Sequence, residues 1–324
     1  MNLTGRAVNR VVGRFQRRFG IRRSRQMARR YNQWRYAEEL AYAERAFEQR
    51  TELLSENDPS FSGTPRNLLK DGWCVDRSGT LPGIDRALAE TDRLIAERGG
   101  VDRRGTRMAQ RDYLFYLLLA PDELDVYPGI LDFLMSSEVI ATAAEAMGTM
   151  PVMAQNLPHG VRMFESTDRF NSQSTYEASQ LFHRDIHSRP LIYVILLARD
   201  TSEANGPWHF LPQSVSDQAS DALGYEKRGV PYYVTDERMA AVTDLSQVIQ
   251  FTGRRGDVLF LDSSRCFHYG SRDAVEPGYR VMYALTPRWR CDFRLMLERL
   301  DYPVEEGDSR LRQIVKGHCP ALEG

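Results

Sequence analysis

The front of the 324-residue chain has apolar residues at helical spacing, whereas short apolar runs typical of strands begin near residue 150. Residues 84–98 are predicted to form a helix after the turn signal Leu81-Pro82-Gly83. Three further helices are predicted over 34–54, 111–119 and 130–147. The last of these is expected to end at Gly148, because glycine commonly terminates helices.

Strands are predicted where the apolar runs are short and bounded by turn residues. The run Leu191–Ala198 is continuously apolar and contains β-branched residues, and shorter apolar runs follow at Val258–Leu261 and Val281–Leu285. The turn signals Asn205-Gly206-Pro207 and Glu276-Pro277-Gly278 separate these runs. Many short strands after a helical front predict a mainly β fold with helical additions, either a sandwich or a jelly roll.

The first 35 residues differ in charge from the rest of the chain. They contain eleven arginines and no acidic residue, so the remaining residues must carry about −12 for the chain to reach its net charge of −1. Within 3–19, apolar residues and arginines recur on different faces at helical spacing, which predicts an amphipathic basic helix. Turn signals between 57 and 65 then interrupt the chain. We therefore predict a basic helical extension over 1–60 and a main domain over 61–324 that includes a C-terminal helical segment.

Composition indicates a folded protein in a reducing compartment. Hydrophobic residues make up 42% of the chain, which allows a sizeable buried core. No apolar run approaches the roughly 18 residues of a spanning helix, and no apolar segment typical of a signal peptide is visible. Cys74, Cys266, Cys291 and Cys319 are scattered, which predicts free thiols rather than a disulfide framework or zinc site. We expect a cytoplasmic protein, and the excess of arginine over lysine favours a bacterial source.

A candidate metal site begins at His183-Arg184-Asp185. On a strand, His183 and Asp185 project to one face, so an imidazole and a carboxylate can occupy neighbouring positions on a metal ion. His268 is the best candidate for a third ligand. Two histidines and one carboxylate leave three positions open on octahedral iron, which suit a bidentate 2-oxo acid and dioxygen. Taken alone, the triplet is also compatible with a surface histidine beside a solvated aspartate.

The order of motifs around these residues resembles the phytanoyl-CoA dioxygenase-like family of 2-oxoglutarate oxygenases. The matching segments are Leu69–Val75, Ser179–Asp185, Asn205–Ser214, Gly256-Asp257 and His268–Arg272, and the resemblance covers roughly residues 64–290. There are two departures from the family pattern. Gln213-Ser214-Val215 stands where the family has P-G-S-H, and Phe182 replaces a common tryptophan. Neither departure removes a metal ligand.

The resemblance implies a cupin-like double-stranded β-helix with metal ligands facing the barrel mouth. In this arrangement His183, Asp185 and His268 would hold Fe(II), with 2-oxoglutarate as co-substrate and dioxygen as oxidant. The implied reaction is an oxygenation of a small molecule, such as a lipid, a sugar or a natural-product intermediate, with release of succinate and CO2. Hydroxylation is the default outcome. Desaturation and ring formation stay open because they use the same ligands.

The same resemblance indicates which residues would bind the co-substrate. Arg280 lies twelve residues after His268 and would bind the distal carboxylate of 2-oxoglutarate. A planar guanidinium group suits this role because it can form two parallel hydrogen bonds with a carboxylate. Arg272 is the closest rival for this role. Gln180 and Arg162 are further candidates for contact with 2-oxoglutarate.

Other functions and partners stay open at this stage. A non-catalytic jelly roll could act as a scaffold, although a scaffold has no chemical need for the full ligand set. The basic arm could meet the phosphates of a nucleic acid, but the arm is amphipathic and the rest of the chain is acidic, so nucleic acid is not the expected partner. An anionic membrane surface would suit residues 1–35 and place the protein at the periphery of a membrane. Packing of the arm on its own domain is an equal alternative, and the sequence does not indicate the oligomeric state.

Overall fold

The computed structural model describes residues 14, 16, 18–99, 115–119, 123–154, 160–166, 176–288 and 302–322. The predicted helix over 3–19 lies almost entirely outside this part of the chain. Cys74 and Cys266 are free thiols, as predicted, and Cys291 lies outside the described residues. No helix in the described ranges is long and apolar enough to cross a membrane.

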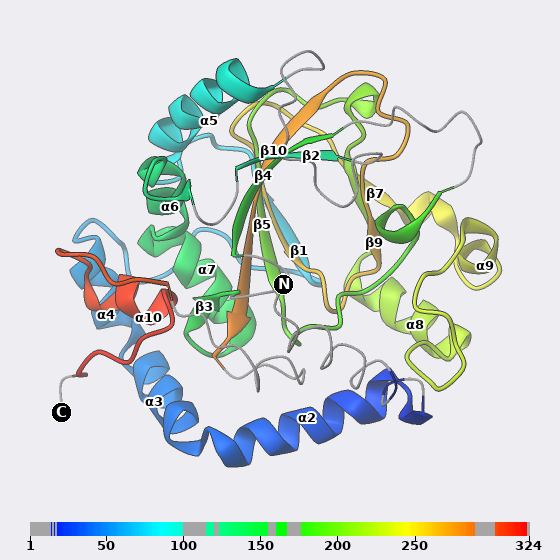
Figure 1. Cartoon of the computed structure of the whole chain (residues 1–324), viewed down its shortest axis with the longest axis horizontal. Helices are drawn as coiled ribbons and strands as arrows, with labels where there is room; N and C mark the ends of the chain where they lie inside the picture. Colours follow the sequence, from blue (N-terminus) through cyan, green and yellow to red (C-terminus); the bar gives the residue numbers. More distant parts are fainter. Residues whose placement is uncertain are drawn as a thin grey trace.

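Ten strands form two antiparallel sheets in the described residues (Figure 1). The strands are β1 (Trp73–Asp76), β2 (Phe115–Leu119), β3 (Pro151–Met153), β4 (Val161–Ser166), β5 (Ile192–Leu197), β6 (Trp208–Phe210), β7 (Ile249–Phe251), β8 (Val258–Asp262), β9 (His268–Tyr269) and β10 (Gly278–Pro287). The larger sheet has the order β1-β8-β5-β10-β4-β2, with β3 also paired to β10, and the smaller sheet has the order β7-β6-β9. Buried side chains from both sheets share one apolar cluster between them. This arrangement is the predicted double-stranded β-helix.

The larger sheet is buried on both faces, which explains the continuous apolar runs in its sequence. In β5, Ile192, Val194 and Leu196 pack outward into the helix-covered core. The alternate residues of β5 join the cluster between the sheets. The same alternation in β10 turns Met282 and Ala284 toward the space between the sheets, and Arg280 lies on the same face of the strand. The larger sheet therefore supplies one wall of the space between the sheets.

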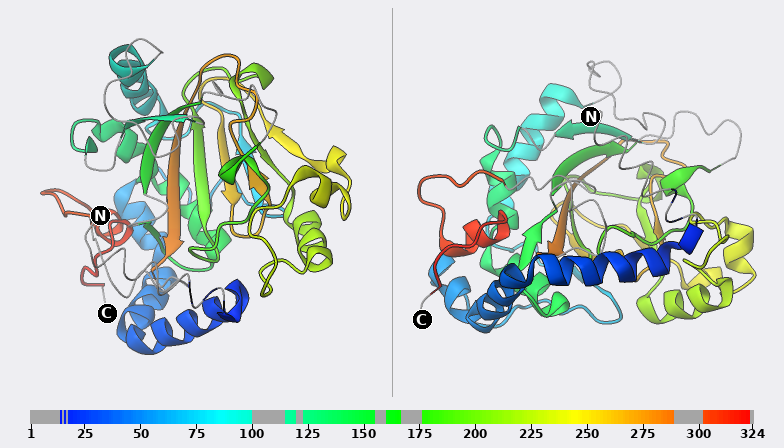
Figure 2. Two further views of the ribbon diagram at one scale, coloured as in Figure 1. Left: turned by 45° about the vertical axis from the view of Figure 1, so that its right-hand side comes forward. Right: turned by 60° about the horizontal axis from the view of Figure 1, so that its bottom comes forward.

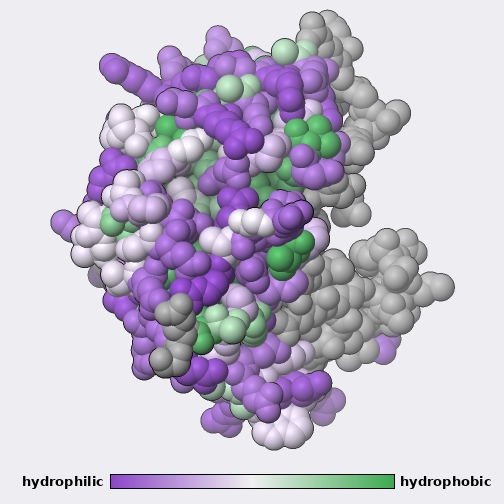
Figure 3. Space-filling view, turned by 90° about the vertical axis from the view of Figure 1, so that its left-hand side faces the viewer, coloured by the Kyte–Doolittle hydropathy of each residue, from purple (hydrophilic) through white to green (hydrophobic). Residues whose placement is uncertain are grey.

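Helices cover the outer face of the larger sheet and both ends of the molecule (Figures 1 and 2). They are α2 (Ile21–Arg35), α3 (Ala37–Glu48), α4 (Arg50–Asn57), α5 (Ile84–Arg98), α6 (Pro128–Leu134), α7 (Ser137–Met147), α8 (Gln213–Leu223), α9 (Asp236–Ala240) and α10 (Arg310–Val315). Apolar residues of α5, α6 and α7 pack into one core with the outward residues of β5, β8 and β10. Their opposite sides form a largely hydrophilic surface with scattered apolar spots (Figure 3).

Three helix predictions differ from the structure. The helix predicted over 34–54 is divided at Tyr36 and Gln49 among α2, α3 and α4. The segment predicted as a helix over 111–119 forms strand β2 at Phe115–Leu119, so the prediction was wrong for these residues. A five-residue apolar run is too short to separate a helix from a strand, and pairing with β4 decides its conformation. The helix predicted over 130–147 is interrupted at Met135 and Ser136 between α6 and α7. The helix predicted over 84–98 is confirmed as α5.

The N-terminal helices pack on the main body. Tyr42 and Ala46 of α3 and Leu53 and Leu54 of α4 belong to the same buried core as the larger sheet. Helix α2 extends past the end of the sheets toward α8 (Figures 1 and 2). These helices share the core of the main domain. The domain boundary near residue 60 stays a prediction.

Candidate metal centre

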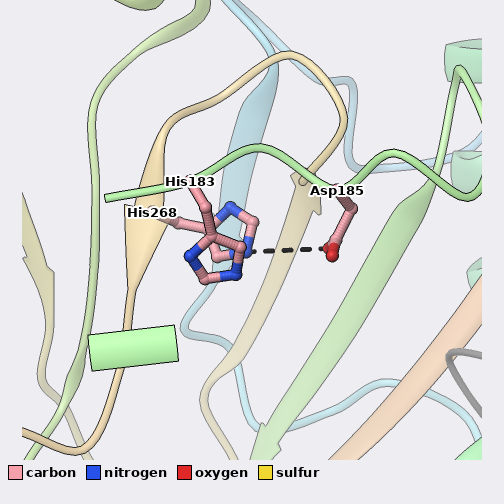
Figure 4. Close-up of side chains that lie close together, drawn as sticks. All are labelled: His183, Asp185 and His268. Carbon is pink, nitrogen blue, oxygen red and sulfur yellow. Dashed lines mark ion pairs between the residues drawn. The ribbon is translucent and has the colours of Figure 1, made fainter. Parts of the chain in front are cut away.

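Backbone pairing brings the three predicted ligands together. The segment that carries His183 runs beside β9, where the N–H of His183 donates to the carbonyl of His268 at 3.1 Å and the return bond measures 2.9 Å. Two residues later, the N–H of Asp185 donates to the carbonyl of Ser263 at 3.0 Å, just after β8. The segment therefore passes from the smaller sheet to the larger one, and Asp185 turns toward the two imidazoles (Figure 4).

The donor atoms of the three side chains converge on one point. One ligand atom from each of His183, Asp185 and His268 lies within 4.8 Å of the other two. Nε2 of His268 is 3.6 Å from Oδ2 of Asp185, and the two imidazole ring centres are 4.4 Å apart. All three residues are buried. This spacing suits three ligands on one side of a single metal ion.

Backbone carbonyls fix which nitrogen of each histidine faces this point. Nδ1 of His183 lies 2.9 Å from the carbonyl oxygen of Leu181, and Nδ1 of His268 lies 3.0 Å from that of Cys266. Each Nδ1 is therefore assigned as the N–H donor, which leaves the lone pair of Nε2 for a metal. Such outer hydrogen bonds hold a ligand ring in one orientation before the metal arrives.

The charges of these residues also suit a metal. Burial would raise the pKa of Asp185, but the imidazoles of His268 and His183 outweigh it and hold that pKa below its usual value. Burial lowers the pKa of His268 more than the carboxylate of Asp185 raises it. At neutral pH the site thus holds an ionised carboxylate and a neutral imidazole, the forms that bind metal. Oδ2 of Asp185 is buried and accepts no hydrogen bond from the described residues, as expected of a ligand atom reserved for a cation.

Aromatic residues that the sequence did not single out surround the three ligands. The indole of Trp208 stacks on the ring of His268, with centres 4.9 Å apart and planes 10° from parallel. The ring of Tyr233 lies edge-on to His183 at 5.5 Å. Burial, followed by the nearby carboxylate of Asp185, raises the pKa of Tyr193, so the phenol lies beside that carboxylate. Trp208 lies inside the Asn-Gly-Pro-Trp segment, so its motif was a usable signal.

Arg280 projects from β10 into the space between the sheets. It is 3% exposed, and its guanidinium group donates to the hydroxyl of Ser166 and, at 2.7 Å, to the carbonyl of Gly206. It forms no ion pair with any described residue, and burial lowers its pKa to about 10. A buried cation without a carboxylate partner is costly, so this position is suited to an incoming anion.

The rival arginine is already occupied. Arg272 forms a two-pronged ion pair with Asp236, at 2.9 and 3.0 Å, and its guanidinium carbon lies 3.5 Å from the ring centre of Tyr269. Its Nε donates to the carbonyl of Gln180 at 2.5 Å. The side chain of Gln180 donates in turn to the carbonyl of Ser271 at 3.1 Å. Arg272 and Gln180 therefore join two loops.

The remaining candidates lie in different places. Arg162 is on β4 and, like Phe164, points into the space between the sheets, and its Nε is buried without a hydrogen bond among the described residues.

His209 stacks on Tyr269 with ring centres 4.6 Å apart, and these two residues help to line a cavity of about 340 Å³ that none of the three metal-ligand candidates lines. Burial lowers the pKa of His209 to about 4. His318 is fixed elsewhere by the carbonyl of Tyr302, 2.6 Å from its Nε2.

Comparisons with known proteins place the chain beside several solved structures. No protein-family model matches the chain, and no curated protein matches it. Crystal structures with similar folds include EctD from S. alaskensis with 2-oxoglutarate and 5-hydroxyectoine, with a TM-score of 0.44, 10% identity, and coverage of 67% of this chain and 72% of that chain. They also include the epimerase SnoN in complex with Fe3+, alpha ketoglutarate and nogalamycin RO, with a TM-score of 0.45, 12% identity, and coverage of 82% and 94%. HygX from Streptomyces hygroscopicus with nickel and 2-oxoglutarate has a TM-score of 0.38, 12% identity, and coverage of 67% and 82%. These likenesses are remote and assign no substrate or reaction to this chain.

Proposed function

We propose that the protein is an Fe(II)- and 2-oxoglutarate-dependent oxygenase of the phytanoyl-CoA dioxygenase-like kind. The observation that carries this proposal is the convergence of His183, Asp185 and His268 inside a double-stranded β-helix. Two imidazoles and one carboxylate form the ligand set that suits non-haem iron, because they bind one side of the ion and leave the other side open. Oδ2 of Asp185, which accepts no hydrogen bond from the described residues, would bind the same ion.

The residues of this chain would hold and orient the reactants. His183, Asp185 and His268 would hold the iron, and Arg280 would bind the distal carboxylate of 2-oxoglutarate. Iron, 2-oxoglutarate and dioxygen together would supply the oxidising power that removes hydrogen from a substrate C–H bond, with release of succinate and CO2. Trp208 would keep the ring of His268 in place and limit the entry of water beside it.

Arg280 is favoured over Arg272 because of its partners. The guanidinium group of Arg272 is neutralised by Asp236, whereas Arg280 has only a hydroxyl and a carbonyl as partners among the described residues. A dianionic co-substrate gains more from a cation that lacks a counter-charge. The inward parity of Arg280 on β10 also directs it into the space between the sheets, where Trp208 and Tyr193 contact the metal ligands.

Turnover of 2-oxoglutarate tests this function. We expect succinate to form only when Fe(II), 2-oxoglutarate, dioxygen and a suitable small molecule are present, and a panel of lipids, sugars and natural-product intermediates would identify that molecule. His268→Ala should abolish succinate formation, while His318→Gln provides a matched histidine control outside the site. Products from the active mixture would separate hydroxylation from desaturation or ring formation. Succinate formation at the wild-type rate in His268→Ala would overturn the proposal.

We also propose that α2 binds an anionic membrane surface. Met27, Tyr31 and Trp34 are 50%, 39% and 74% exposed and share one face of this helix, and the exposed Arg23 and Arg30 flank them. Such a face gains from apolar burial at the lipid interface and from attraction to anionic headgroups.

The opposite face of α2 packs on the chain itself. Ser24, Ala28 and Asn32 are buried there, and Arg25 pairs with Glu226 at 2.6 Å. Packing therefore holds the helix without covering its apolar stripe. Sedimentation with phosphatidylglycerol-containing vesicles should be lost in the double variant Tyr31→Ser, Trp34→Ser. Equal sedimentation of both proteins, or equal binding to neutral vesicles, would contradict this surface, and salt-sensitive binding to DNA instead would favour nucleic acid.

A further inference from the structure

Two cations face the interior of the barrel from the larger sheet. Inward positions of β4, β5 and β10 are otherwise neutral, and include Phe164, Ser166, Tyr193, Ile195, Leu197, Met282 and Ala284. Arg162 and Arg280 are the exceptions, on the neighbouring strands β4 and β10. Neither forms an ion pair with a residue in the described ranges, unlike Arg272 with Asp236. The described strands thus supply one more inward-facing cation than the distal carboxylate of 2-oxoglutarate requires.

The two guanidinium groups have different surroundings. Arg280 lies against Ser166 and Gly206 and is almost fully buried. Arg162 is half-buried and lies beside the hydroxyl of Tyr193, and the same hydroxyl lies beside the carboxylate of the metal-ligand candidate Asp185. The phenol of Tyr193 therefore lies between Arg162 and the metal centre, and Arg162 is partly accessible to solvent. A co-substrate held by Arg280 would leave Arg162 accessible to a second molecule.

Charge balance indicates what that second molecule carries. Iron(II) and the two guanidinium groups bring four positive charges into the interior. Asp185 and the two carboxylates of 2-oxoglutarate bring three negative charges, so one positive charge stays uncompensated by the described residues. A buried or half-buried charge without a partner is unfavourable, and Nε of Arg162 has no hydrogen-bond acceptor among the described residues.

We propose that Arg162 binds an anionic group of the prime substrate, a carboxylate or a phosphate, and thereby positions the substrate beside the metal. This inference rests on the proposed function, because it assigns 2-oxoglutarate to Arg280. The ring of Phe164, 5.1 Å from the guanidinium carbon, supports one face of that group. The hydroxyl of Tyr193 lies beside the same group. The substrate class is therefore an organic acid or phosphate ester rather than a neutral lipid or sugar.

Binding to the Mn(II)-loaded protein separates the roles of the two arginines. Calorimetry should show that Arg280→Met weakens 2-oxoglutarate binding more than about tenfold, whereas Arg162→Met changes it by less than about threefold. Arg86→Met, on the exposed side of α5, is the matched control and should leave the affinity unchanged. An Arg162→Met variant that loses as much affinity as Arg280→Met would assign Arg162 to the co-substrate and overturn the inference.

The anion preference is tested with acetate and acetamide as probes. With 2-oxoglutarate bound, Mn(II) should accelerate the relaxation of the methyl protons of acetate far more than those of acetamide. This difference should vanish in Arg162→Met and return in part in Arg162→Lys, which restores the charge. Equal relaxation of the two probes in the wild type would overturn the anionic site while leaving the proposed function intact. Wild-type protein that binds no 2-oxoglutarate would instead overturn the proposed function itself.

Discussion

Replacing Arg280 by methionine should stabilise the ligand-free protein. Burial lowers the pKa of Arg280 from 12.5 to about 10, a difference that corresponds to about 3 kcal/mol. A base with a lowered pKa opposes folding at every pH below that value, because the folded chain must then carry the buried charge. The bonds to Ser166 and Gly206 offset this by about 1 kcal/mol each. The variant should therefore gain about 1 kcal/mol in the free energy of unfolding at neutral pH.

The same substitution should remove most of the response to 2-oxoglutarate. Losing one partner of a buried charge pair costs about 2–5 kcal/mol, so the Kd should rise by at least about 30-fold. Scanning calorimetry of the Mn(II)-loaded protein, with and without 2-oxoglutarate, measures both effects. Wild-type protein should have the lower ligand-free Tm and the larger ligand-induced increase. A variant that is less stable than wild type and keeps the full ligand-induced increase would refute this reasoning.

Three further substitutions test separate parts of the structure. Because burial lowers the pKa of His209 to about 4, the unfolded chain binds a proton between pH 6.5 and about 4 at this residue and the folded chain does not. The free energy of unfolding should therefore fall by about 3 kcal/mol as the pH drops through this range. Urea titrations of His209→Gln should lack that decline. An unchanged pH dependence would show that another group is responsible. Trp208→Leu should weaken Fe(II) binding by about tenfold in anaerobic calorimetry, because the stacked ring of His268 loses its support; an unaltered Kd would count against this positioning role. Arg272→Met should lower the free energy of unfolding by about 2 kcal/mol in denaturant titrations but leave 2-oxoglutarate binding intact. Loss of that binding without loss of stability would exchange the roles of Arg272 and Arg280.

The strands that hold the site could be predicted because they are buried on both faces. The continuous apolar run of β5 and the shorter runs of β8 and β10 leave few alternatives to strands in a two-layer fold. Strand β2 could not be predicted in the same way. Its apolar segment Phe115–Leu119 has no period that excludes a helix, and its conformation depends on pairing with distant β4. Contacts distant in sequence also explain why the helical extension shares the main core.

The convergence of the candidate metal ligands could be anticipated because alternation along an extended segment places His183 and Asp185 on one face. The choice among the arginines needed the structure. Arg272 is engaged because Asp236, far away in the sequence, lies against it, and no local pattern shows that pairing. Likewise, the stack of Trp208 on His268 depends on the pairing of β6 with β9. Local spacing therefore indicated the candidate metal donors, whereas tertiary contacts decide which arginines have a carboxylate partner among the described residues.

Anaerobic calorimetry of Fe(II) binding tests the metal centre most directly. We predict one Fe(II) per wild-type chain and no measurable site in His183→Ala or in His268→Ala, because each variant lacks one of three converging donors. His318→Gln, a histidine held by the carbonyl of Tyr302, should bind Fe(II) as the wild type does. Undiminished Fe(II) affinity in both alanine variants would contradict the metal centre and, with it, the proposed oxygenase.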